Sequence, residues 1–165
     1  KGAYKYAYDL IEHIRKSSDI CIAAAAYVEG HVDSLRLSED LKHLKRKVDA
    51  GTDLLVTQLF FDNRLYFDFI EKARRIGINC PVEAGIMPVF RADQIKSIAA
   101  KSGCSIPAKL VLVMDKYQDN PEDMRKAGIE YAALQIRDLI ANGADGIHLY
   151  TMNRPKSTAE ILESI

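Results

Sequence analysis

The sequence predicts an α/β protein built around a parallel β-sheet. Four short and mainly apolar segments, at 20–26, 54–60, 81–87 and 146–152, alternate with segments of helical periodicity. The first of them, ICIAAAA, is apolar on both faces, which is typical of a fully buried strand in a parallel sheet. Strands that alternate with helices are joined by right-handed crossovers and lie parallel. The 165 residues are enough for one compact domain with a sizeable core.

Amphipathic helices are predicted on both sides of the first strand. The opening stretch KGAYKYAYDLIEHIRK (1–16) has a helical pattern with an apolar side formed by Leu10, Ile11 and Ile14. After the strand, Ser38 is the predicted cap of a second helix, and Gly51 ends it. Glu39 and Asp40 suit the positive end of its dipole. Its predicted buried stripe is Leu41, Leu44 and Val48.

Five further segments with helical periodicity follow the second strand. Residues 64–76 are closed by Gly77, and residues 92–101 are stopped by Gly103. Residues 107–117 and 120–143 form a helical pair with no strand between them, and the last helix begins at residue 157. In the second helix of the pair, Asn120 is the predicted cap and Pro121 takes the first turn. The predicted buried positions of these helices are Leu65, Phe69, Ile70, Ala73, Ile76, Ile95, Ile98, Ala99, Ile129, Ala132, Ala133, Ile136 and Ile140.

Composition and charge favour a small-molecule partner. The chain carries 23 basic and 23 acidic residues, so it has no overall electrostatic footprint for nucleic acid or an anionic membrane surface. Three cysteines lie far apart without a CxxC pair, which argues against a zinc site or a disulfide framework and fits a reducing cytoplasm. The apolar runs are too short for a membrane span or a signal-peptide core.

Polar residues interrupt the apolar pattern where the predicted strands end. They are Tyr27 to His31, Gln58, and Asn153 with Arg154. Because the carboxyl ends of parallel strands form the ligand face of α/β folds, Gln58 is a candidate ligand contact. From the residues alone, an amide satisfied by backbone at a strand end is the slightly favoured alternative. The alternation of Glu29, His31 and Asp33 fixes no coordination geometry, so no metal site is predicted.

Several motifs together resemble one enzyme family. KRKVDAGTDLLVTQLFFD, AGIMPV and LYTMNRP, with YAYDL and AAAAYVEGH upstream, are similar to the bacterial methylenetetrahydrofolate reductases. The resemblance runs from about Tyr6 to the end of the chain. It implies a (β/α)8 TIM barrel, FAD as cofactor and NAD(P)H as co-substrate. The family barrel has about twice as many strands, so residues 1–165 are expected to be the C-terminal half of a single reductase domain, supplying its last four β/α units.

The resemblance also implies cofactor contacts. By matching positions, FAD is expected to contact Tyr6, Ala7, Tyr27, His31, Asp40 and Lys47. Ser34 and His43 occupy two further contact positions where the family pattern has other polar residues. Asp40 and Lys47 are seven residues apart and project from one helix face, where a carboxylate can accept from ribose hydroxyls and an ammonium can meet phosphate.

The substrate contacts implied by the resemblance are Gln58, Gln94 and Arg154. Gln58 is also implied to contact the nicotinamide. An amide can donate to and accept from a pterin edge, and a guanidinium can bind a carboxylate of the glutamate tail. The family's general acid and its flavin-side aspartate have no counterpart in this sequence. No catalytic side chain is therefore predicted in this chain, and the chain alone is expected to be inactive.

Two alternatives remain beside a reductase of one-carbon metabolism. One is a non-catalytic half-barrel subunit or partner protein derived from the family, and it is disfavoured by the joint retention of Tyr27, His31, Asp40, Lys47, Gln58 and Arg154. The other is a different flavin barrel such as a proline dehydrogenase relative, which the motifs do not suggest. Tyr131 and Tyr150 are expected to be core or rim aromatics. The open edges at 20–26 and 146–152 are expected to drive homo-oligomerisation or pairing with the missing half of the barrel.

Overall fold

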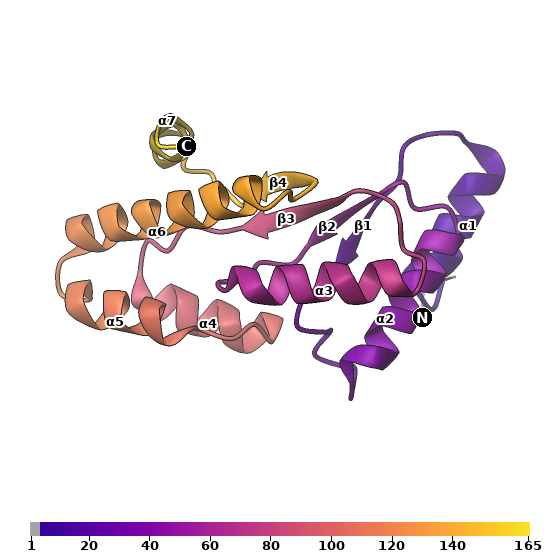
Figure 1. Ribbon diagram of the computed structural model, residues 1–165, viewed down its shortest axis with the longest axis horizontal. Helices are drawn as coiled ribbons and strands as arrows, with labels where there is room; N and C mark the ends of the chain where they lie inside the picture. The colour runs from indigo at the N-terminus through magenta and orange to yellow at the C-terminus, as the bar shows by residue number, and fades with distance from the viewer. Residues whose placement is uncertain (1–3) are drawn as a thin grey trace.

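The computed structural model describes residues 4–165 and shows four parallel strands with helices between them (Figure 1). The strands are β1 (Ala23–Ala26), β2 (Leu54–Thr57), β3 (Val82–Ile86) and β4 (Gly146–Leu149), and their order in the sheet is β1-β2-β3-β4. Each pair is parallel. The predicted α/β class, the four strands and the two open edges are confirmed, although every strand is shorter than its apolar segment.

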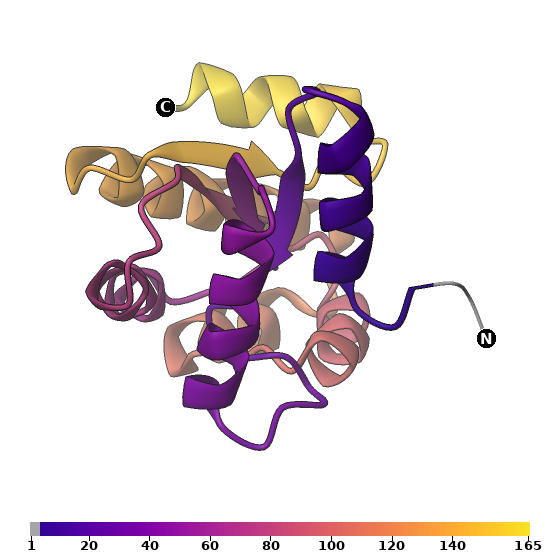
Figure 2. The ribbon, with the colours of Figure 1, turned by 90° about the vertical axis from the view of Figure 1, so that its right-hand side faces the viewer.

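Seven helices connect or flank these strands within the described residues. They are α1 (Ala7–Ser17), α2 (Leu37–Asp49), α3 (Asn63–Arg75), α4 (Ala92–Ser102), α5 (Ala108–Tyr117), α6 (Pro121–Ala141) and α7 (Pro155–Glu163). Helices α1 and α2 pack against each other beside β1 (Figure 2). Residues 1–3 of the predicted opening helix lie outside the described residues. No helix within residues 4–165 is both long enough and apolar enough to cross a membrane.

The helices cover one face of the sheet. On that face, Ala26, Leu55, Val82, Ala84 and Ile86 pack into a core with apolar side chains from α2, α3, α6 and α7. A second cluster lies past the carboxyl ends of the strands, where α4, α5 and the start of α6 meet (Figure 1). The main core is therefore on the side of the sheet that faces outward in a barrel.

The opposite face of the sheet has no helix over it. Ala23 and Ala25 are exposed there, and all four residues of β4 are half-buried. The prediction that the first strand is buried on both faces is therefore wrong for this structure. The reason is that β1 and β4 are edge strands, and the open face is the one that points into the interior of a closed barrel.

The helix starts and the buried helix positions agree with the predictions from the sequence, with some exceptions. Asn120 caps α6 and Pro121 is its first residue, as predicted. Ser38 is not a cap, because α2 begins one residue earlier with Arg36 at the cap position and no side-chain cap bond. Ile76 and Ile140 were predicted to be buried and are exposed, while Tyr66 and Leu139 are buried in their place.

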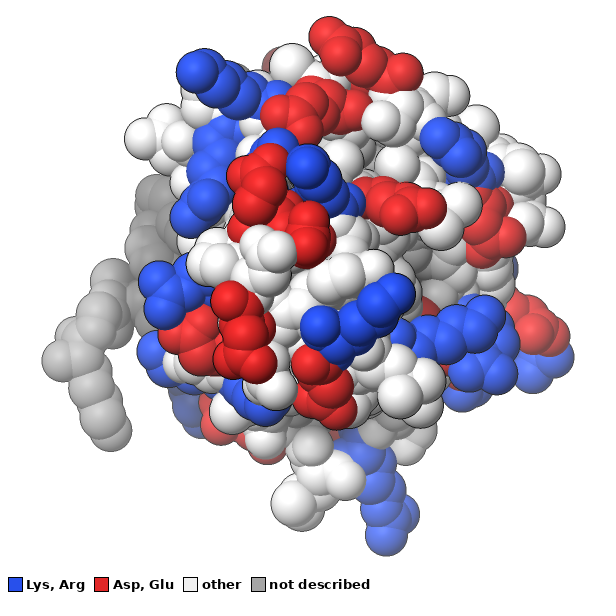
Figure 3. Space-filling view, turned by 90° about the vertical axis from the view of Figure 1, so that its left-hand side faces the viewer, with Lys and Arg blue, Asp and Glu red and all other residues white. Residues whose placement is uncertain are grey.

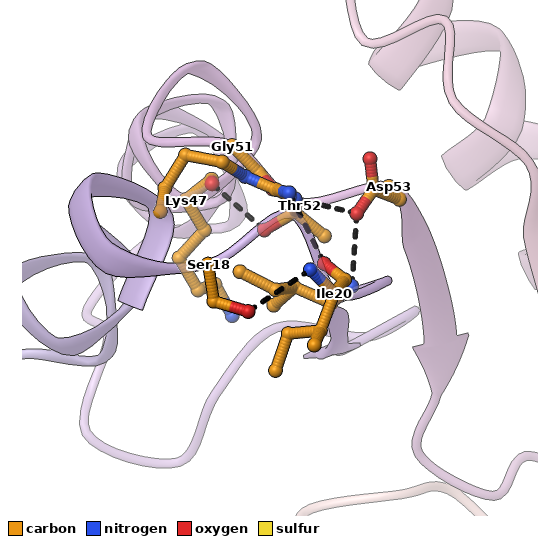
Figure 4. A network of polar contacts seen from close by, with 8 residues as sticks. Ser18, Ile20, Lys47, Gly51, Thr52 and Asp53 are labelled. Atoms are coloured by element: carbon orange, nitrogen blue, oxygen red, sulfur yellow. Dashed lines mark hydrogen bonds and ion pairs between the residues drawn. The ribbon is translucent and has the colours of Figure 1, made fainter. Parts of the chain in front are cut away.

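An ion-paired arginine joins α1 to the amino ends of β1 and β2 (Figure 4). Arg15 donates to the carbonyl oxygens of Gly51 and Ile20 and to Oδ2 of Asp53. The same Asp53 oxygen accepts from the backbone N–H of Ile22 at 2.8 Å. These bonds lower the pKa of the Asp53 carboxyl, first through the Ile22 amide and then through Arg15. The first helix is thus tied to the end of the sheet opposite the predicted ligand face.

Thr57 at the end of β2 joins β2, β3 and the residue after β4. It is fully buried, its hydroxyl oxygen accepts from the backbone N–H of Gly85 at 2.8 Å, and its carbonyl accepts from the Tyr150 hydroxyl at 2.9 Å. A Cβ atom at Gly85 would lie 2.2 Å from the Thr57 carbonyl oxygen and 2.9 Å from the Tyr150 ring. Only glycine permits this close approach.

Replacing Thr57 by valine tests the role of its hydroxyl. The substitution keeps the side-chain shape but leaves the Gly85 N–H buried without its acceptor, so we expect a loss of about 1–3 kcal/mol in the free energy of unfolding. Urea denaturation of the wild type and the variant measures this loss. Thr158→Val is the control, because the Thr158 hydroxyl bonds to Arg154 at an exposed helix start. Equal stability losses in the two variants would contradict the assignment.

Candidate functional site

Residues from all four strands form one row across the open face of the sheet. The register pairs Ala26 with Thr57, Val56 with Glu83, and Gly85 with His148. Continued by one residue from β1–β2 and by two from β2–β3, it aligns Tyr27, Gln58, Gly85 and His148 side by side near the carboxyl ends of the strands. This row lies where ligands bind in parallel α/β folds, so the structure brings Tyr27 and Gln58 together as the sequence predicted.

The Tyr150 ring covers the middle of this row. It lies over Gly85, where a side chain would clash with it, and its hydroxyl bonds to the residue before Gln58. The His148 ring meets it edge-on with 4.8 Å between ring centroids. Burial raises the pKa of the Tyr150 phenol, which keeps it a neutral donor. The expectation that Tyr150 is a rim aromatic is confirmed, and the ring stands beside the candidate amide.

Gln58 has one backbone partner for its side chain. Its Oε1 accepts from the backbone N–H of Leu59 at 3.0 Å, while its own backbone N–H bonds to Ala26 at 2.7 Å. Among residues 4–165, Nε2 of Gln58 donates to no protein acceptor within hydrogen-bond distance. The side chain lines a pocket of ≈ 10 Å³. That volume holds about one water, so a ring-sized ligand has to lie outside this pocket, over the open face.

The predicted FAD contacts lie along the β1 side of the sheet. The Tyr6 and His43 rings are stacked at 6.1 Å, which brings the start of α1 next to α2. The Tyr27 and His31 rings meet edge-on at 4.7 Å. Ala7 is the exposed first residue of α1.

The polar members of the predicted FAD set continue along α2. Asp40 is almost fully buried, and its Oδ1 accepts from the Ser34 hydroxyl at 3.2 Å. Lys47 lies two turns further on, and its Nζ donates to the Ala25 carbonyl. Burial lowers the pKa of the Lys47 ammonium, and the Asp40 carboxylate opposes this shift. Hydroxyl, carboxylate, imidazole and ammonium groups in one neighbourhood suit the ribose and phosphate groups of a dinucleotide.

Lys47 reaches the open edge of the sheet. The Ile22 and Ala26 carbonyls accept from the β2 side, so the carbonyl of Ala25, of opposite parity, points to the free edge of β1. The ammonium therefore satisfies an edge acceptor that a further strand would satisfy in a closed barrel. Release of Lys47 toward a phosphate and pairing of that edge with a neighbouring strand are compatible with each other.

The predicted substrate residues do not all meet in one pocket. Arg154 lines a cleft of ≈ 480 Å³ and lies over the Phe90 ring, with 4.7 Å from its Cζ to the ring centroid. No carboxylate within residues 4–165 is in ion-pair contact with Arg154, whereas Arg91 and Arg125 in the same cleft are both paired. Gln94 lies on α4 and lines neither the cleft nor the Gln58 pocket.

Sequence reasoning missed a histidine–glutamate pair on the open face. His148 Nδ1 lies 3.8 Å from Glu83 Oε2, and both side chains are partly exposed. The two residues are 65 positions apart along the chain, and only the β3–β4 register brings them together. Within the described residues, no group of three or more His, Cys, Asp or Glu side chains is arranged to hold a metal ion.

A parallel sheet with helices on one face and polar groups at the carboxyl ends of its strands defines a ligand-binding protein of the α/β-barrel class. Residues 1–165, the entire chain, match the family model described as methylenetetrahydrofolate reductase. The chain belongs to the methylenetetrahydrofolate reductase family, whose fold is a TIM barrel. The family resemblance read from the motifs is therefore confirmed.

Individual relatives agree with this assignment. The chain is 38% identical to methylenetetrahydrofolate reductase (NADH) 1 of Arabidopsis thaliana, with 100% of this chain and 30% of that protein covered. It is 33% identical to the 5,10-methylenetetrahydrofolate reductase of Escherichia coli, with 97% of this chain and 54% of that protein covered. The chain thus spans about half of the bacterial relative and less than a third of the plant relative.

A solved structure supports the fold. It is described as an uncharacterized protein from Clostridium thermocellum that binds two copies of 5-methyl-5,6,7,8-tetrahydrofolic acid. The match has a TM-score of 0.62 at 14% identity, and covers 96% of this chain and 57% of that chain. At that identity the likeness shows the fold alone.

Proposed function

We propose that this chain is the C-terminal half of a flavin-dependent reductase domain, residues 1–165, that converts 5,10-methylenetetrahydrofolate to 5-methyltetrahydrofolate at the expense of NAD(P)H. The observation that carries the proposal is the position of Gln58, beside the Tyr150 ring at the carboxyl ends of the strands, in a chain that matches the reductase family throughout. The folate bound by the structural neighbour and the oxidoreductases among the relatives support it.

In this proposal the chain positions ligands and supplies no acid. Tyr6, Ala7, Tyr27, His31, Ser34, Asp40, His43 and Lys47 would hold FAD along the β1 side. The flavin would supply the hydride chemistry when bound. Gln58 would orient the pterin and the nicotinamide through its free amide N–H groups.

The glutamate tail of the folate would reach the cleft that Arg154 lines. Arg154 has no carboxylate partner within the described residues, so it can pair with a carboxylate of that tail. Gln94, on α4, would be a further folate contact. The general acid belongs to strands that face these four across the barrel.

Reversing the charge of Lys47 tests the cofactor site. In a complete reductase containing this chain, Lys47→Glu should weaken FAD binding by about 1–3 kcal/mol, because it replaces a charge-assisted hydrogen bond to phosphate by repulsion. Flavin fluorescence titration measures the dissociation constant. Lys45→Glu is the matched control, because Lys45 lies on the same helix and pairs with Asp49. A colourless complete protein that takes up no FAD would refute the cofactor assignment.

Truncating Gln58 tests the substrate site. Gln58→Ala should slow reduction by NAD(P)H and oxidation by methylenetetrahydrofolate while FAD stays bound, because one amide serves both ligands. Stopped-flow absorbance of the flavin follows both half-reactions. Gln118→Ala, at the exposed end of α5, is the control. Unchanged rates for both half-reactions would exclude the proposed role of Gln58.

The isolated chain provides a third test. Residues 1–165 alone should show no folate reduction, because the family's general acid and flavin-side aspartate are absent from this sequence. NAD(P)H oxidation with methylenetetrahydrofolate, in the presence of added FAD, measures the activity. Restoration of activity on mixing with a separately expressed first half of a family barrel is the positive control. Turnover by the isolated chain would show that the missing residues are assigned wrongly.

A further inference from the structure

The outer surface of α5 and α6 carries an apolar groove. The groove has a volume of ≈ 290 Å³, and its walls include Leu112 and Tyr117 from α5 and Tyr131 and Leu134 from α6. Leu112 is 69% exposed and Leu134 is 54% exposed, which is unusual for leucines that lie side by side. Neither the open face of the sheet nor the predicted ligand sites include this groove.

A ridge stands next to the groove on the same surface. Glu130 and Leu134 are one helical turn apart on α6 and therefore project from the same side. A second hollow of ≈ 230 Å³, between α6 and α7, has Glu130 and Leu134 in its wall as well. The two residues thus form a ridge with a hollow on each side. A surface that carries a ridge and a matching hollow is complementary to a copy of itself.

The charges at the groove are also self-complementary. Lys116 from α5 and Glu130 from α6 both line it, and neither is in an ion pair within residues 4–165. Charges of both signs are interspersed at the end of the molecule where α5 and α6 are joined (Figure 3). Many charges on α3 and at the start of α4 are in ion pairs. A copy turned by a two-fold axis would bring its Glu130 to this Lys116 and its Lys116 to this Glu130.

We propose that the α5–α6 groove is the contact between two copies of this chain, related by a two-fold axis, with Leu134 of each copy in the groove of the other. A second copy of the chain accounts for three features of this surface: the two exposed leucines, the two hollows beside one ridge, and the two unpaired charges of opposite sign. This contact does not use the open strand edges, and it leaves the carboxyl ends of the strands free for ligands. It does not depend on the proposed reaction.

A charge exchange across the contact tests the proposal. Lys116→Glu and Glu130→Lys each create two like-charge pairs in the dimer, so each variant alone should dimerise at least about tenfold more weakly than the wild type. An equimolar mixture of the two variants restores both opposite-charge pairs, and so does the double variant Lys116→Glu/Glu130→Lys. We therefore expect the mixture and the double variant to dimerise like the wild type.

Light scattering on size-exclusion fractions of a complete reductase that contains this chain, in which the edges of β1 and β4 are paired, measures the mass against that of one copy. Leu134→Asp should give monomers, and Leu35→Asp, at a leucine that is 93% exposed outside the groove, should not change the mass. Circular dichroism confirms that each variant is folded. A monomeric wild type would overturn the proposal. Association that is equal in the wild type, the single charge variants and Leu134→Asp would place the contact outside the α5–α6 groove and also overturn the proposal.

Discussion

The buried hydrogen bonds of Thr57 are the interaction on which the ligand face depends. The Thr57 hydroxyl accepts from the backbone of β3 at Gly85. The Thr57 carbonyl accepts from the side chain of Tyr150, the residue after β4. Because a Cβ at Gly85 would overlap the Thr57 carbonyl, the strands approach here only with glycine at that position. Gln58 is the next residue after Thr57. Its position on the open face is therefore fixed by one buried and one partly buried hydrogen bond of the preceding residue.

The sequence correctly predicted the structural features that depend on residues close to one another along the chain, such as helix starts and ends. Asn120 and Pro121 begin α6 because an amide cap and a fixed φ act within one turn, and the left-handed Gly103 ends α4 for the same local reason. Burial depends on what packs from elsewhere, so it was predicted less well. Ile140 continues the apolar period of α6, but Leu139 faces the core, because the last turn of α6 is oriented by its packing on the sheet and α7.

The same distinction explains the predicted site. Gln58 could be found from its strand, because a polar residue after an apolar run marks a strand end. The pairing of Glu83 with His148 could not, since it depends on the alignment of two strands separated by three helices. Lys47 was found by family resemblance, yet its bond to the edge of β1 follows only from the parity of the carbonyls. The register between neighbouring strands could not be predicted from the sequence.

The open face also constrains what must lie across it. Its positions include Ala23, Ala25, Gly85 and Gly146, which contribute little or no side-chain volume. Barrel interiors are filled by layers of side chains from alternate strands, at the density of other protein cores. Since this half supplies so little volume near β1 and β3, the volume has to come from large side chains of the facing strands or from a bound ring system. In the proposed reductase, a planar ligand beside Gln58 and the Tyr150 ring would meet that requirement at the carboxyl ends of the strands.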